Sequence, residues 1–97
     1  MNLYDEYQAI MPSNALIDRF SDGLGTLLDA TSINVTEVAD IVSFMKEKQL
    51  YPDKASIDQL FAKALSRLKI MPEGEEKQRF NQACSDLKDI LRFVFTH

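Results

Sequence analysis

The sequence has few of the residues that form disulfides, bind metal ions or carry out catalysis. It has one cysteine, Cys84, and one histidine, His97, among 97 residues. A single cysteine excludes an internal disulfide and argues against a secreted disulfide scaffold, so a reducing compartment is expected, with the cytoplasm as the default. Paired cysteines, a His-x-x-x-His spacing and a calcium-binding loop are also missing, so no metal site is predicted.

Long apolar runs are missing as well. Nowhere do about eighteen apolar residues follow one another, which is the length a membrane-spanning helix needs. The first six residues, 1–6, lack the basic head and apolar run of a signal peptide. The sequence therefore predicts a soluble protein with no membrane contact and no export signal of the common type.

Catalytic and nucleotide-binding motifs are equally scarce. The one Gly-x-Gly, at 23–25, lies inside a helical pattern without a preceding strand or a following lysine. His97 is the last residue, where a catalytic base would be poorly held. Cys84 lies between Phe80 and Leu87 on an apolar stripe, where a small buried thiol is the common occupant. We therefore expect neither an enzyme nor a bound cofactor.

The charges that are present divide unevenly along the chain. Residues 1–45 contain seven acids and one base, whereas residues 46–97 contain eight acids and ten bases. Asp18 and Asp22 share one face of a predicted helix, and a solvated acidic face is the interpretation we favour over a cation site. Such a face repels nucleic-acid phosphates and attracts basic proteins.

Apolar residues recur with a period near 3.6 in four segments, and no segment alternates with period two, which predicts an all-helical fold. The first helix begins at about Ser13 and contains two glycines, Gly23 and Gly25, where it would bend or be closely approached. Asn34 with Glu37 forms a capping box for the second, with Thr36 as the alternative cap. The expected inward stripes are Leu16, Ile17, Phe20, Leu24, Leu27 and Leu28 in the first helix, and Val35, Val38, Ile41, Val42 and Met45 in the second.

The second helix should end before Pro52, because a proline disfavours helical geometry at the residue before it. Asp53 or Ser56 caps the third helix. Residues 72–74 break the pattern before the fourth, whose first turn carries the acids Glu75 and Glu76. The expected stripes are Ile57, Leu60, Phe61, Ala64, Leu65 and Leu68 in the third helix, and Phe80, Ala83, Cys84, Leu87, Ile90, Leu91 and Val94 in the fourth.

Residues 1–97 should form one domain, since no stretch resembles a hinge between two cores. Short connections between four amphipathic helices favour an antiparallel four-helix bundle or a compact orthogonal four-helix domain. Residues 1–12, which end at Pro12, suggest a short helical N-terminal arm.

Some aromatic residues fall off the inward stripes. At about 100° per residue, Phe44 and Phe93 each lie about 120° from the centre of their stripe, and Phe95 lies at its edge. Two interpretations stay open: the N-terminal arm covers Phe93, or Phe44 and Phe93 form with Tyr51 an exposed apolar patch for a partner or a second copy.

These observations favour a small acidic protein-binding module, such as an inhibitor, immunity factor, dedicated chaperone or assembly subunit. Its expected partner-binding residues are Phe44, Tyr51, Phe93, Phe95, Asp18 and Asp22. The expected partner is another protein, with a basic surface, or a second copy in a homodimer. The alternative is a DNA-associated regulator in which the second and third helices form a helix-turn-helix with Lys63 and Arg67 as contacts, although acids at the start of the third helix make nucleic acid the weaker choice.

Overall fold

The computed structural model describes residues 13–96, which form four helices and no strand. The helices are α2 (Ser13–Asp29), α3 (Val35–Glu47), α4 (Lys54–Ile70) and α5 (Glu75–Thr96). The prediction of an all-helical, four-helix fold is confirmed. The predicted N-terminal arm, residues 1–12, lies outside the described residues.

Two of the helices begin at N-caps that the sequence predicts. The Asn34 side chain accepts a hydrogen bond from the backbone N–H of Glu37 at 3.1 Å, and its own amide lies 3.5 Å from the Glu37 carboxylate. Asp53 caps α4 by accepting from the N–H of Ser56 at 2.8 Å. These bonds satisfy backbone donors that have no partner inside the helix. Of the alternatives left open by the sequence, Asn34 and Asp53 are therefore the caps.

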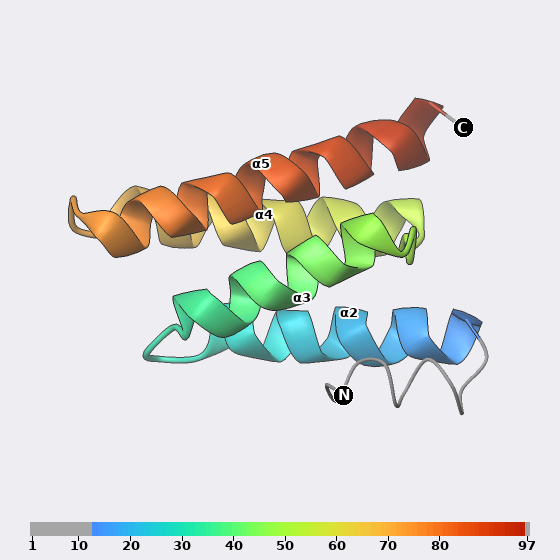
Figure 1. Cartoon of the computed structure of the whole chain (residues 1–97), viewed down its shortest axis with the longest axis horizontal. Coiled ribbons are helices and arrows are strands. Elements are labelled where there is room, and N and C mark those ends of the chain that lie inside the picture. The colour runs from blue at the N-terminus through green and yellow to red at the C-terminus, as the bar shows by residue number, and fades with distance from the viewer. Residues whose placement is uncertain (1–12, 97) are drawn as a thin grey trace.

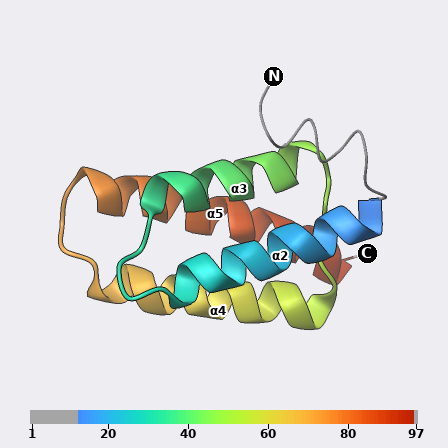
Figure 2. The same ribbon diagram turned by 90° about the horizontal axis from the view of Figure 1, so that it is seen from below.

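The helices are arranged as two antiparallel hairpins, α2–α3 and α4–α5, laid side by side (Figures 1 and 2). Each helix packs against two others: α3 and α4 both contact α2 and α5. The remaining two pairs, α2 with α5 and α3 with α4, occupy opposite corners, and their backbones do not approach each other. As a result, α2 runs parallel to α4 and α3 runs parallel to α5 (Figure 1).

A single apolar core fills the centre of this four-cornered arrangement. The predicted stripes supply it, with Leu16, Leu24, Val38, Ile57, Phe80, Leu87 and Ile90 among the most buried side chains. Leu65 is a correction to the predicted stripe of α4, because it is 36% exposed. The buried positions of α4, such as Leu60 and Ala64, lie on the side of the helix that faces α2 and α5. Leu65 lies outside this buried side and is partly exposed to solvent.

The two glycines of α2 do not interrupt the helix, which is continuous from Ser13 to Asp29. A Cβ added at Gly23 would meet nothing within 4 Å, and one at Gly25 would lie 3.7 Å from Leu60 Cδ2, an ordinary contact. The predicted close approach of a neighbour at these glycines is therefore wrong.

The C-terminus of α3 sets the direction in which the chain leaves for α4. Gln49 takes a positive φ of 57°. The N–H of Leu50 bonds to the carbonyl of Met45 at 2.9 Å, and the N–H of Gln49 to that of Lys46 at 3.3 Å. This is the Schellman arrangement, in which a left-handed residue closes the helix and the next apolar residue turns inward. Leu50 is accordingly buried, and the chain then crosses to α4 by way of Tyr51 and Pro52.

Candidate functional site

The largest apolar side chains on the surface gather where α5 ends and α4 begins. Phe93 is 45% exposed and Phe95 is 49% exposed, in the last turn of α5. The ring of Tyr51 packs against that of Phe93, with centroids 4.6 Å apart and planes at 49°. We call Tyr51, Phe93 and Phe95 the aromatic patch. Phe93 thus lies off the inward stripe, as the periodicity predicts, and Phe95, expected at the edge of the stripe, is exposed as well. The structure brings Tyr51 to Phe93.

A cation lies beside this patch. The Nζ of Lys54, the first residue of α4, is 5.8 Å from the centre of the Phe95 ring. This distance permits a cation–π attraction, which is worth roughly 0.5–1 kcal/mol at an exposed site. The helix start that Asp53 fixes is therefore also what holds Lys54 near the end of α5.

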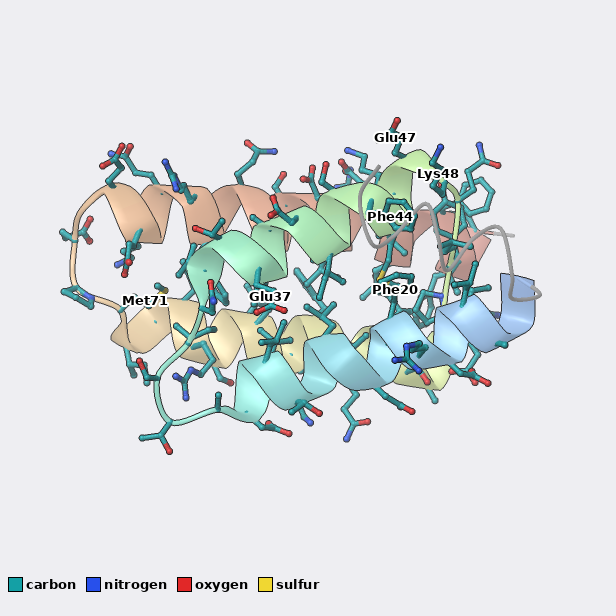
Figure 3. All side chains as sticks on the ribbon, turned by 60° about the horizontal axis from the view of Figure 1, so that its bottom comes forward. Phe20, Glu37, Phe44, Glu47, Lys48 and Met71 are labelled. Atoms are coloured by element: carbon teal, nitrogen blue, oxygen red, sulfur yellow. The ribbon has the colours of Figure 1, made fainter. Side chains whose placement is uncertain are left out.

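Phe44 does not belong to the patch, and the interpretation that placed it in an exposed apolar patch with Phe93 and Tyr51 is wrong. It is buried, with only 9% of its surface exposed, and its ring centroid lies 5.4 Å from that of Phe20 on α2 (Figure 3). The reason is that α3 packs against both α2 and α5, so it buries a wider arc than a single stripe. Phe44 fills the part of that arc that faces α2.

The acids Asp18 and Asp22 are both exposed on α2. Because α2 does not pack against α5, the structure does not bring them into one helix interface with Phe93 and Phe95. Asp22 instead lines an open hollow of about 340 Å³ between α2 and α4. Asp18 and Asp22 therefore lie on a different helix from Phe93 and Phe95, and α4 lies between the two helices.

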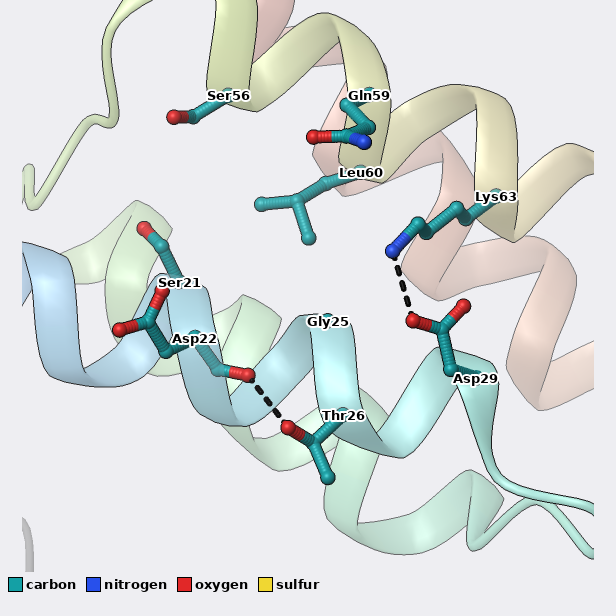
Figure 4. Close-up of a pocket in the computed structure, with 9 residues that line it drawn as sticks. All are labelled: Ser21, Asp22, Gly25, Thr26, Asp29, Ser56, Gln59, Leu60 and Lys63. Atoms are coloured by element: carbon teal, nitrogen blue, oxygen red, sulfur yellow. Dashed lines mark hydrogen bonds and ion pairs between the residues drawn. The ribbon is translucent and has the colours of Figure 1, made fainter.

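The hollow between α2 and α4 is mainly polar (Figure 4). Lys63 Nζ lies 2.8 Å from Asp29 Oδ2 and closes one end of it. The Thr26 hydroxyl donates to the backbone carbonyl of Asp22 at 3.0 Å, while the buried Ser21 hydroxyl has no hydrogen-bond partner within the described part of the chain. Sequence reasoning missed this hollow, because it depends on α2 and α4 being neighbours.

Across the opposite interface, Lys46 joins α3 to α5. Its Nζ donates to Asp89 at 2.8 Å and to Asp86 at 3.2 Å. Hydrogen bonds to Asp89 and then Asp86 raise the pKa of Lys46, and the bond from Lys46 lowers the pKa of Asp89. Exposed pairs of this kind add little free energy each, but two carboxylates on one ammonium fix the register of the two helices.

Cys84 is buried in the core, as the sequence predicts. Burial raises the pKa of its thiol to about 11. Because the thiolate is the reactive form of cysteine, the thiol stays protonated and unreactive near neutral pH. Among residues 13–96, no three or more His, Cys, Asp or Glu side chains are placed to hold a metal ion.

The helix-turn-helix interpretation relies on a helix pair that does not form. In that motif the two helices pack against each other, whereas α3 and α4 stand at opposite corners here. The two cations assigned to it are also engaged elsewhere: Lys63 pairs with Asp29, and Arg67 donates to the backbone carbonyl of Thr31 at 3.3 Å.

None of the helices within residues 13–96 combines the length and the apolar character that crossing a bilayer requires. Comparison of the chain with protein-family models, with curated proteins and with solved structures gives no match.

Proposed function

We propose that this protein is a small protein-binding module that acts by occupying the surface of another protein. The observation that carries the proposal is the aromatic patch. Phe93 and Phe95 keep nearly half of their surface exposed while packing beside Tyr51 and Lys54. Aromatic side chains of this kind anchor protein interfaces, because they bury a large apolar area with few rotatable bonds.

The module would work as an inhibitor, immunity factor, dedicated chaperone or assembly subunit, each of which acts by covering a partner's surface. The partner-binding residues of the proposal are Tyr51, Phe93 and Phe95. Phe44 is not one of them, because its side chain is part of the core. Attraction of a basic partner by Asp18 and Asp22 stays a prediction, and from α2 they would act on the approach of the partner and not as contacts.

The proposal is tested in two steps. The molar mass in solution is first measured by light scattering over a hundredfold range of concentration, which decides whether a second copy occupies the patch. Proteins retained from lysate are then compared between the wild type, a Phe93→Ser/Phe95→Ser double variant and Ile70→Ser. Ile70 is a matched control, because it is apolar and 76% exposed but lies at the end of α4 that faces away from the patch.

The expected result is a dimer or a retained protein that the double variant loses and Ile70→Ser keeps. All three proteins are first shown by thermal unfolding to be folded. Self-association and retention that are the same in the double variant as in the wild type would overturn the proposal.

A further inference from the structure

The outer side of α4 and α5 carries two adjoining hollows that together form a groove along the two helices. The larger has a volume of about 480 Å³ and the smaller about 270 Å³, and both are lined by Asn81 of α5. The α4 side, which we call the floor, is formed by Phe61 and Leu65 in the larger hollow and by Leu68 in the smaller. We call this the α4–α5 groove.

The floor of the groove is apolar along most of its length. Phe61, Leu65 and Leu68 follow one another at the i, i+4 and i+7 positions of α4, so they form a row on one side of that helix. The row runs back along α4 toward Lys54, whose Nζ lies beside Phe95. From residue 61 to residue 68 the distance along the helix is about 10 Å, which is two turns of a docked helix and spans its i, i+4 and i+7 positions.

The rim of the groove is mainly basic. Lys88 lines the larger hollow, and Arg92 follows it four positions later on the same side of α5. Lys54 adds a third cation near the Phe95 end, and Lys77 a fourth in the lining of the smaller hollow. Two acids oppose them: the exposed Asp58 on α4, and Glu73, which lines the smaller hollow and pairs with Lys77. In the described part of the chain Lys88 forms no ion pair, in contrast to Lys46, Lys63 and Lys77.

From the apolar floor, the length and the basic rim, we infer that the α4–α5 groove binds an acidic amphipathic helix of a partner protein. Such a helix would lay apolar side chains at i, i+4 and i+7 onto Phe61, Leu65 and Leu68, and would place carboxylates beside Lys88 and Arg92. This inference rests on the proposed function and adds the chemistry of the partner. It also places the contact on a different surface from the acidic residues of α2.

The inference is tested with a displayed library of helices of about fourteen residues, held helical by a carrier scaffold and selected on the whole protein. The selected helices should be acidic and carry an apolar stripe, and raising the salt concentration should weaken their binding. Leu65→Ser should reduce their affinity roughly tenfold through lost apolar contact. Lys88→Glu should reduce it roughly fivefold or more through charge repulsion.

Two matched controls accompany these variants. Ile70→Ser makes the same kind of change at an exposed aliphatic residue of α4 outside the groove, and Arg79→Glu reverses a charge on α5 outside the groove. Both should bind the selected helices with wild-type affinity. Selection of no helix, of basic helices, or of helices that bind Leu65→Ser and Lys88→Glu as tightly as the wild type would overturn the inference.

The same helices distinguish failure of the groove from failure of the aromatic patch. Helices that lose affinity on Phe93→Ser and not on Leu65→Ser would overturn the groove and leave the proposed function in place. The groove would be supported, and the patch ruled out as the binding site, by two results together. The selected helices would lose affinity for Leu65→Ser and Lys88→Glu, and the proteins retained from lysate would bind the Phe93 variant as well as the wild type.

Discussion

The ring of Phe44 on α3 lies 5.4 Å from the ring of Phe20 on α2, and both side chains are buried. This contact joins the two helices of the first hairpin near its open end, one turn before α3 ends at Glu47 (Figure 3). A phenylalanine that lies off the main stripe of its helix is therefore a structural residue of the interface between α2 and α3.

Phe44→Ala should lower the free energy of unfolding by about 3 kcal/mol, because it removes a buried ring and leaves a cavity beside Phe20. Phe93→Ala should cost less than about 1.5 kcal/mol, since that side chain is half exposed; the loss includes its contact with Tyr51. Urea denaturation monitored by circular dichroism measures both. Equal losses for the two variants would contradict the assignment of Phe44 to the core.

Gly23→Ala should raise the free energy of unfolding by about 1 kcal/mol, because alanine favours a helix interior and its Cβ would enter open space. Gly74→Ala should have the opposite sign and cost about 1–3 kcal/mol. Gly74 precedes α5 at a φ of 152°, which side chains rarely adopt. Thermal unfolding compares the two, and a stabilised Gly74→Ala would show that this backbone geometry is not the native one.

Gln49→Gly should stabilise the protein by about 1 kcal/mol, because Gln49 occupies the left-handed position that ends α3, where glycine carries no Cβ penalty. Lys48→Gly is the control: Lys48 has a negative φ of −91°, so glycine there brings no such gain. The midpoints of urea unfolding should separate the two variants. If both shift in the same direction, the stabilisation does not come from the positive φ.

Asp53→Ala should lower the midpoint of thermal unfolding at neutral pH and should lose this effect in acid. The hydrogen bond from the backbone of Ser56 lowers the pKa of Asp53 in the folded protein. The stability that the Asp53 carboxylate contributes is therefore complete above the usual carboxyl pKa of about 3.9. It is lost as the pH falls through the lower pKa that Asp53 has in the folded protein. The exposed Asp58, which caps no helix, is the control for loss of an aspartate from α4: at neutral pH, Asp58→Ala should lower the midpoint less than Asp53→Ala.

The local features of the fold could be predicted from the sequence, because each depends on neighbours within one turn. Asn34 and Asp53 cap their helices through residues three positions away, and the break at 72–74 needs only its own proline and glycine. Burial of Cys84 followed from the stripe on which it lies. These are short-range consequences of hydrogen bonding and helical periodicity.

The errors concern which helices are neighbours. Phe44 is buried because α3 meets two helices, and Leu65 is exposed because the outer side of α4 meets none among the four described. The contact of Tyr51 with Phe93 joins residues far apart in the sequence, and no periodicity within one helix predicts it. The α4–α5 groove could not be predicted from the sequence either, because it depends on α4 and α5 being neighbours.

The diagonal placement of α3 and α4 also governs the order in which the protein assembles. Within each hairpin the contacting residues are close in sequence, so α2 with α3, and α4 with α5, can pair after closing a short loop. The contacts of α2 with α4 and of α3 with α5 require the whole intervening helix to be in place, which costs more loop entropy. On loop entropy alone we therefore expect the hairpins to be the early units of folding, and the seam between them, which Lys46 spans, to close last.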